Sequence, residues 1–312
     1  NIMSGLKIPE PHETTVDSIE ITTMTGCPIK CTICPQTPLK KNYKSNTKYL
    51  SLENFKLAIS TLPKDILINF AGYSEPFANK DAIYMIEYAL EQGYAVALYS
   101  TLYKVDMELA KKIVELKRRF ANSFCRIFIH LKDASDNMPG LLVTSQYLSV
   151  LEYLESNIDS IMCMTMDVNN KAHKEIKALQ NSIVDWIFHS RAGTLVEDNE
   201  VLHQKNWKNE WIIECTKSND LKTGVLLPNG DVSLCCMDFG LKHIIGNLFT
   251  QTYNEIQSGE PLAKIKESNN TPGFHTDVLC RTCPEACDKT PWNDSEVYDL
   301  VKRIDPDSLG LG

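Results

Sequence analysis

Cysteine content is the feature that most constrains how this chain can fold. Eleven cysteines lie in 312 residues, and most of them are grouped near the two ends of the sequence. Disulfide bonds would explain that number in a secreted protein, but they are rare in reducing compartments. The sequence begins without the cationic and apolar stretches of a signal peptide. We therefore expect a cytoplasmic protein whose cysteines bind metal or iron–sulfur clusters.

The composition argues against several other classes of protein. With 43% apolar and 23% charged residues, the chain is typical of a globular protein. Its longest apolar runs are too short to cross a membrane. The net charge of −8 argues against nucleic acid as the main partner, because phosphate binding needs a basic surface. We expect neither a membrane nor a nucleic acid among its partners.

Between residues 16 and 190, apolar extended segments alternate with amphipathic helices. Strands are predicted at residues 16–24, 66–70, 94–99, 124–130, 158–168 and 183–188. The helices are predicted at residues 52–62, 81–92, 107–119, 145–155 and 172–180. Such alternation implies parallel strands joined by right-handed crossovers. Because the six units are fewer than those of a closed TIM barrel, we expect an α/β fold built on a partial (β/α)6 barrel.

The alternation stops near residue 190, which divides the chain into parts. Residues 1–190 are predicted to form the barrel, residues 191–214 a polar linker, and residues 215–312 a small second domain. This domain is expected to contain a β-hairpin, since Asn229-Gly230 is a strong turn signal. Two short helices are predicted after the hairpin, at residues 252–258 and 262–267.

The first cysteine group directly follows the first predicted strand. Cys27, Cys31 and Cys34 are separated by three and two residues. Thiolates at this spacing can hold three irons of a 4Fe–4S cluster, which leaves the fourth iron without a protein ligand. An open coordination position is typical of a catalytic metal site. A zinc site is the alternative, although zinc ligands usually come as two separated pairs.

With this motif, residues 16–190 resemble the radical S-adenosylmethionine (SAM) enzymes. Their signature is the same three-cysteine spacing in the loop after strand one of a partial (β/α)6 barrel. After strand two, that family has a glycine-rich segment ending in Glu-Pro, which binds the amino group of SAM. This chain has Phe-Ala-Gly-Tyr-Ser-Glu-Pro at residues 70–76. The resemblance therefore rests on two motifs at corresponding places.

The resemblance implies roles for individual residues of this loop. Gly72 would allow close backbone approach to SAM, and Glu75 would be the partner of its ammonium group. Tyr73 and Ser74 stand where the family prefers glycines. Ile33 stands where an aromatic side chain often lies beside the adenine.

Further polar residues are expected at the carboxyl ends of the strands, where barrels of this kind place their chemistry. By resemblance, the positions that would line the ribose or adenine of SAM are Ser100, His130 and Thr165. Candidates for a catalytic base near the substrate are His189, Arg191 and Lys132.

The second cysteine group resembles the C-terminal extension of SPASM/twitch radical SAM proteins. A twitch domain holds one auxiliary 4Fe–4S cluster through two cysteines flanking a hairpin and a later Cys-x-x-Cys pair. The corresponding ligands here would be Cys215, Cys235, Cys280 and Cys283. Cys236 and Cys287 would be spare, although Cys287 could replace one of the four. A structural zinc site on the same thiolates is the alternative.

The resemblance implies cleavage of SAM to a 5′-deoxyadenosyl radical, which removes a hydrogen atom from the substrate. An electron donor such as flavodoxin or ferredoxin would reduce the first cluster. Only 26 residues precede Cys27, so we expect no peptide-recognition domain and favour a small sugar or aminocyclitol-like substrate. In layout the chain is similar to the radical SAM alcohol dehydrogenases of aminoglycoside biosynthesis, which favours oxidation of a carbinol assisted by the auxiliary cluster.

Three alternatives stay open. An epimerase would return a hydrogen atom from a thiol, for which Cys236, Cys287 and Cys163 are candidates. A maturase of ribosomal peptides would use the auxiliary cluster during crosslinking. A non-catalytic electron carrier or zinc-stabilised binding module would have no use for an open three-cysteine site beside the Gly72 segment.

Overall fold

The computed structural model describes residues 17–167, 169–185, 191–192, 210–273 and 277–289. Its centre is an eight-stranded sheet in the order β5-β4-β3-β2-β1-β7-β8-β9. Strands β1 to β5 and β7 run parallel, whereas β8 and β9 are antiparallel additions at one edge. The strands are β1 (Ser18–Ile21), β2 (Leu67–Phe70), β3 (Ala95–Ser100), β4 (Phe124–His130), β5 (Ile161–Met164), β7 (Thr223–Leu226), β8 (Asp231–Ser233) and β9 (Ile244–Asn247). A separate two-stranded sheet pairs β6 (Ile213–Cys215) with β10 (Ala286–Asp288).

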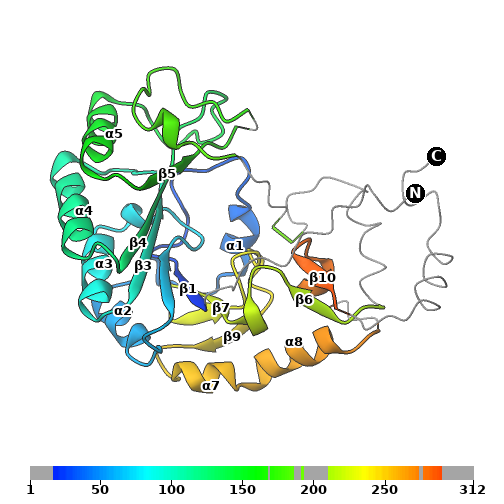
Figure 1. The fold of residues 1–312 in the computed structure, drawn as a ribbon. Coiled ribbons are helices and arrows are strands. Elements are labelled where there is room, and N and C mark those ends of the chain that lie inside the picture. Colours follow the sequence, from blue (N-terminus) through cyan, green and yellow to red (C-terminus); the bar gives the residue numbers. More distant parts are fainter. Residues whose placement is uncertain (1–16, 168, 186–190, 193–209, 274–276, 290–312) are drawn as a thin grey trace, which may run out of the picture.

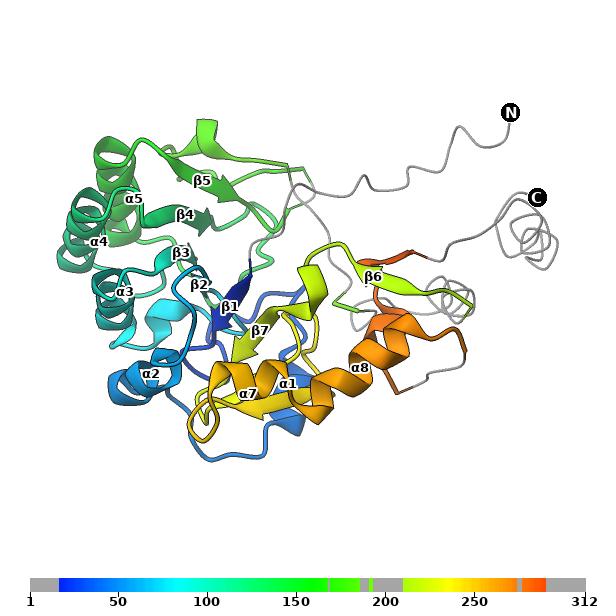
Figure 2. The same ribbon diagram turned by 60° about the horizontal axis from the view of Figure 1, so that its bottom comes forward.

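The helices α2 to α5 lie along one face of the parallel strands, as Figures 1 and 2 show. The α-helices are α1 (Gln36–Asn42), α2 (Leu52–Ile59), α3 (Ala82–Glu91), α4 (Met107–Arg119), α5 (Ser145–Asn157), α7 (Tyr253–Gln257) and α8 (Glu260–Asn270). Short 3₁₀ turns are η1 (Pro76–Ala78), η2 (Gln180–Ser182), η4 (Asn219–Leu221) and η5 (Leu279–Thr282). The predicted α/β class, with a mostly parallel sheet and a small C-terminal unit, is confirmed. No helix in the described ranges is both long and apolar enough to span a membrane.

Local sequence signals account for the elements of the barrel half. Ser51, Asp106 and Thr144 each accept a hydrogen bond from the backbone N–H three residues later, as N-cap side chains do. In β1 the apolar Ile19 and Ile21 are buried, whereas the alternating residues Ser18 and Glu20 are half-buried. This period of two places the polar side chains of the strand on the face opposite the core.

Residues 172–180 do not form the predicted helix. The backbone there pairs instead with the loop after β4: Ala172 bridges Asp133, and the His173 N–H donates to the Lys132 carbonyl. The prediction was wrong because the backbone of this segment forms hydrogen bonds with the loop after β4 and not within a helix, which a local apolar pattern does not reveal. Of the predicted strand 183–188, Ile183 forms a parallel bridge with Cys163, and residues 186–188 lie outside the described ranges.

Two further findings differ from the sequence analysis. The apolar segments around Cys163 and Cys125 predict that both are small core residues; Cys163 is buried, but Cys125 is exposed. It is the extra residue of a bulge in β4, since Phe124 pairs with Val96 and Arg126 with the adjacent Ala97. The elements α1, β6, β9 and β10 were not anticipated, because each is short or depends on a distant partner.

The C-terminal hairpin belongs to the same sheet as the barrel strands. All four residues of β7 pair with β1 in parallel register, from Ser18 with Thr223 to Ile21 with Leu226. The predicted turn at Asn229-Gly230 connects β7 to β8, and Gly230 has a φ of 88°. Ser233, the last residue of β8, lies opposite Val225, which itself pairs with Glu20, so this register places the cysteines after β8 beside β1 near Glu20.

Tyr73 links the glycine-containing loop to the hairpin. Its side chain is only 1% exposed and packs edge-on against Phe239, with 4.6 Å between the ring centroids. The hydroxyl lies 2.8 Å from the Cys235 carbonyl oxygen, 3.1 Å from that of Asp238 and 2.6 Å from Ser233 Oγ. Burial raises the pKa of Tyr73 well above its usual value, so the hydroxyl remains a donor. Tyr73 therefore fixes the position of the loop that carries Cys235 and Cys236.

Replacing Tyr73 with phenylalanine should keep the ring contact and remove these hydrogen bonds. We expect the free energy of unfolding to fall by about 1–3 kcal/mol, because buried acceptors lose their donor. Chemical denaturation of the two proteins measures the difference. Tyr253→Phe is the matched control, since the buried Tyr253 hydroxyl has no hydrogen-bond partner among the described residues. Equal loss in both variants would show that Tyr73 contributes through its ring alone.

Candidate active site

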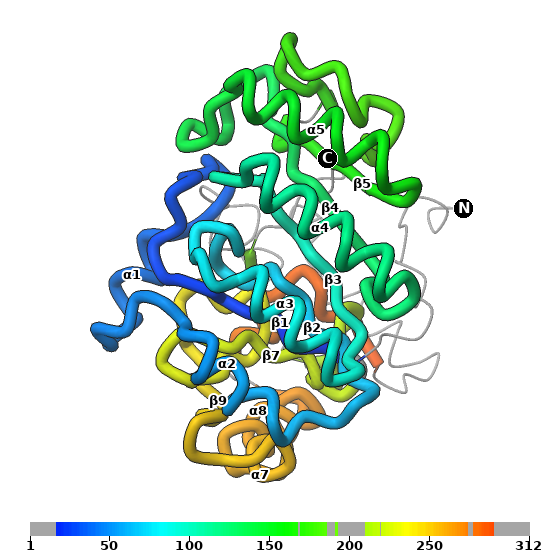
Figure 3. Tube along the Cα trace, turned by 90° about the vertical axis from the view of Figure 1, so that its left-hand side faces the viewer, coloured from blue at the N-terminus to red at the C-terminus, as the bar shows by residue number. Residues whose placement is uncertain are grey.

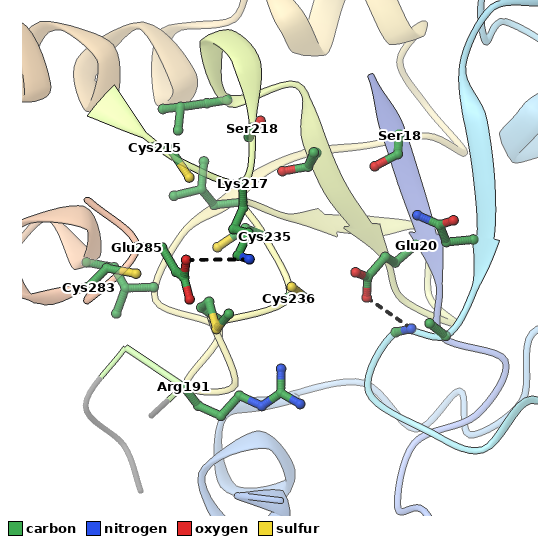
Figure 4. A pocket seen from close by; sticks show the side chains of 18 of the residues that line it. Ser18, Glu20, Arg191, Cys215, Lys217, Ser218, Cys235, Cys236, Cys283 and Glu285 are labelled. Carbon is green, nitrogen blue, oxygen red and sulfur yellow. Dashed lines mark hydrogen bonds and ion pairs between the residues drawn. The ribbon is translucent and has the colours of Figure 1, made fainter. Parts of the chain in front are cut away.

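A cavity of about 680 Å³ lies between the inner face of the barrel strands and the C-terminal cysteines. Barrel residues that line it include Glu20 of β1, Asn69 of β2 and His130 of β4. The C-terminal part contributes five of its cysteines: Cys215, Cys235, Cys236, Cys280 and Cys283. Figure 4 shows Glu20 facing the loop that carries Cys236 across this space, and Arg191 extending into the space from below that loop. The cavity thus connects the two regions that the sequence singled out separately.

The first cysteine group occupies the loop after β1, and its thiols are half-buried. Backbone hydrogen bonds shape the loop: Gly140 N–H donates to Ile29, and Thr32 N–H donates to Asn137. Burial raises the pKa of Cys27 to about 11, and burial together with the neighbouring thiols Cys34 and Cys27 raises the pKa of Cys31. A buried thiolate needs a compensating positive charge, which iron would supply.

The donors around these thiols also fit a cluster. Gln36 Nε2 lies 3.3 Å from Cys34 Sγ, and the Glu75 N–H lies 3.4 Å from Cys27 Sγ. N–H groups of this kind stabilise thiolate ligands in iron–sulfur sites. Within the described ranges, no three His, Cys, Asp or Glu side chains converge on a single-ion site. The thiols of a four-iron cluster bind different irons, so they have no need to share one centre.

The loop after β2 approaches β1 closely at Gly72. This residue has a φ of 59°, and a Cβ atom there would lie 2.5 Å from Thr22 Oγ1. Only glycine fits that position without strain. The Gly72 N–H donates to Glu20 Oε2 at 3.1 Å, and the Met24 N–H donates to Ser74 Oγ at 3.4 Å. These contacts hold the loop beside the cavity, which Gly72 itself lines.

The carboxylate of Glu75 is buried and accepts four hydrogen bonds within the protein. Its donors are Ser100 Oγ at 2.7 Å, Thr101 N at 2.6 Å, Thr101 Oγ1 at 2.8 Å and Phe77 N at 3.1 Å. These bonds tie the loops after β2 and β3 together. In this structure the side chains of Glu75 and Ser100 therefore contact each other. Their predicted contacts with SAM stay predictions.

The other predicted residues fall into two groups. Ile33, His130, Arg191 and Cys236 line the cavity. Lys132 and Thr165 are buried away from it: Lys132 Nζ pairs with Asp136 and donates to the Met138 carbonyl, and Thr165 Oγ1 lies beside Asp167. His189 lies outside the described ranges. Burial and the charge of Arg191 lower the pKa of His130 to about 4, so this imidazole is neutral near pH 7.

Two cavity residues were missed by the sequence analysis. Glu20 sits in the middle of β1, where its carboxylate is hydrogen-bonded to Gly72 and to the Cys236 thiol. Burial raises the pKa of Glu20, and the nearby charge of Arg191 opposes that shift. Asn69 of β2 also lines the cavity, and its Oδ1 has no hydrogen-bond partner among the described residues. Polar residues alternating with apolar ones in these short strands were the signal that could have revealed both.

The four predicted ligands of the auxiliary cluster all line the same cavity. Burial raises the pKa of Cys280 to about 11, which again favours a compensating metal. Cys287 lies on β10, with its Sγ 3.5 Å from the Glu214 carbonyl, and does not line the cavity. Cys236 instead faces Glu20 and Arg191.

Arg281, which lies inside the Cys-x-x-Cys turn, helps to position that turn. Its side chain is 1% exposed and donates to four backbone carbonyls, those of Trp211, Ser268, Asn269 and Thr271. His243 Nε2 also accepts the Leu279 N–H at 3.0 Å, which connects the turn to the segment after β8. Buried polar contacts thus hold both cysteine-bearing segments in place.

A family model for SPASM, an iron–sulfur cluster-binding domain, matches residues 215–284. The match contains all four predicted ligands and favours iron–sulfur clusters over zinc. Sequence comparison with curated proteins finds no match.

Solved structures share the fold at low sequence identity. BtrN in complex with AdoMet and 2-DOIA is 13% identical with a TM-score of 0.56, covering 91% of this chain and 98% of BtrN. Native anSMEcpe with bound AdoMet is 13% identical with a TM-score of 0.54, covering 94% of this chain and 98% of anSMEcpe. Streptococcus suis SuiB bound to S-adenosylmethionine is 12% identical with a TM-score of 0.53, covering 93% of this chain and 73% of SuiB. The family model and these structures support the predicted cofactors, iron–sulfur clusters and SAM.

The resemblance drawn from the cysteine motifs is confirmed: residues 215–284 match the model of the SPASM iron–sulfur cluster-binding domain, and the chain shares the fold of the AdoMet-bound structures of BtrN and anSMEcpe.

Proposed function

We propose that this chain is a radical SAM oxidoreductase that oxidises a small, polar, sugar- or aminocyclitol-like substrate. The observation that carries the proposal is the cavity shared by the barrel face and the auxiliary cysteines. A substrate in this space would lie between the SAM-binding loops and Cys235, Cys280 and Cys283. The likeness to BtrN, whose structure contains AdoMet and 2-DOIA, supports a small substrate.

The cofactors would be held by two sets of residues. Cys27, Cys31 and Cys34 would hold the first cluster, and the loop around Gly72 would place SAM beside it. When bound, the cofactors supply hydrogen-atom abstraction by way of SAM and an electron acceptor at the auxiliary cluster. The protein supplies orientation and a space that excludes bulk water.

The substrate would be oriented by the polar groups of the cavity. Asn69 Oδ1 is an acceptor without a partner among the described residues, so it would receive a substrate hydroxyl or amine. The neutral imidazole of His130 can also donate or accept a hydrogen bond. Oxidation of a carbinol to a carbonyl releases one hydrogen atom, one electron and the hydroxyl proton. Glu20, whose carboxylate faces the cavity, would accept that proton.

The cluster assignment predicts a simple metal count. Anaerobically prepared protein should contain about eight irons per chain, and a Cys27/Cys31/Cys34→Ala variant about four. The variant should also lose formation of 5′-deoxyadenosine from SAM. Iron and sulfide analysis together with chromatography of the nucleoside measure both. About four irons in the parent, accompanied by zinc in both proteins, would contradict the auxiliary cluster and the oxidoreductase proposal.

Cys236 supports an epimerase as the second candidate. Its thiol lies in the cavity and is hydrogen-bonded to Glu20, so it could return a hydrogen atom to a substrate radical. Such an enzyme would not need an external acceptor for the second electron.

Paired variants distinguish the two reactions. For an oxidoreductase, Glu20→Gln should slow product formation about 100-fold while 5′-deoxyadenosine still forms, because the proton acceptor is lost. Cys236→Ala should leave oxidation nearly unchanged. The measurement is mass spectrometry of product from a panel of amino sugars and cyclitols in deuterated water. Deuterium at the reacting carbon, lost in Cys236→Ala, would instead identify an epimerase.

A further inference from the structure

The segment around the first cysteine loop carries an unusual charge. Residues 21–52 contain five lysines and neither aspartate nor glutamate, although the whole chain has a net charge of −8. We name this group the lysine rim; it consists of Lys30, Lys40, Lys41, Lys44 and Lys48. All five lysines are exposed.

The rim surrounds the cysteine loop in space as well as in sequence. Lys30 lies between Cys27 and Cys31. Lys40, in the last turn of α1, has its Cε 3.5 Å from the point that a Cβ on Gly26 would occupy. The Lys48 carbonyl accepts the Thr25 N–H at 2.9 Å, so Lys48 lies beside the residues that precede Cys27. Figure 3 shows α1 and the chain that follows it at the left-hand edge of the molecule.

The charge of the rim is not neutralised by ion pairs within the described residues. Lys44 Nζ donates to the Lys41 carbonyl, and Lys48 Nζ lies 5.4 Å from the centre of the Tyr49 ring. In contrast, Lys112 on α4 is bound by two glutamates, Glu87 and Glu115. Asp231 of β8 is an acidic group near this segment; together with burial, its charge raises the pKa of Tyr43. The rim therefore presents a positive field next to half-buried cysteines.

We infer that the lysine rim is the docking surface for an acidic protein that carries single electrons. The inference rests on the proposed function, because a cluster at Cys27, Cys31 and Cys34 must receive an electron from outside the chain. Charge complementarity speeds the encounter of such partners and orients the donor toward the loop. A nucleic acid would also be attracted by lysines. We favour the electron carrier because these five lysines, which have no ion pair within the described residues, surround the loop of a redox site in an acidic chain.

Charge reversal at the rim tests the inference. The variant Lys40→Glu/Lys41→Glu/Lys48→Glu leaves the cysteines and Lys30 intact. The matched control is Lys80→Glu/Lys111→Glu/Lys174→Glu, which changes the net charge equally at exposed positions away from the loop. Both proteins should retain parental iron content and circular dichroism.

The measurement is the second-order rate of cluster reduction by flavodoxin hydroquinone, followed by stopped-flow absorbance at low ionic strength. We expect the rim variant to be at least tenfold slower than the parent, with a weaker dependence on salt, and the control to be nearly unchanged. Reduction by photoreduced deazariboflavin, a small uncharged reductant, should be the same in all three proteins.

Equal flavodoxin rates in the rim variant and the parent would overturn the inference. So would loss of poly(U) RNA binding in the rim variant with flavodoxin reduction intact, which would assign the surface to nucleic acid. Failure of the proposed function is separately visible, because deazariboflavin-reduced parent protein would then form no 5′-deoxyadenosine from SAM.

Discussion

Parallel pairing of β1 with β7 is the constraint on which the rest of the site depends. It joins the C-terminal hairpin directly to the barrel sheet, since four residues of each strand are in register. Tyr73 adds a second fixed point by placing its hydroxyl on the backbone around Cys235. Together these contacts hold two cysteine-bearing loops beside one cavity, which Ile33 of the first loop and Cys235 and Cys236 of the second line.

The site also illustrates how buried polar groups can be satisfied internally. Glu75 is saturated by four donors, which makes it a rigid connection between two loops of the barrel. Glu20 has fewer protein donors and faces the cavity beside Arg191 and Cys236. The difference follows from position: Glu75 lies in the loop after β2 and does not line the cavity, whereas Glu20 lies on β1 and lines it. Glu20 is therefore the carboxylate that we propose as the proton acceptor.

Sequence reasoning succeeded where the signals were local. The boundaries of α4 and β4 match the prediction, since Asp106 caps the helix and the strand is a short apolar run. It failed at residues 172–180, where pairing with the loop after β4 replaced a helix. Thr165 and Lys132 were expected near the ligands, yet both side chains are engaged elsewhere. Strand ends can be located from a pattern, whereas the direction of a side chain depends on distant neighbours.

The sequence by itself determined the chemistry available to this protein, because the spacing of Cys27, Cys31 and Cys34 and the later cysteines limits which cofactors can bind. The tertiary structure alone decided how these groups meet. It placed β7 beside β1, brought the Tyr73 hydroxyl to the Cys235 carbonyl, and placed Cys236 next to Glu20. The physical reason is that strand pairing and buried hydrogen bonds join residues far apart in the chain, and no local pattern records them.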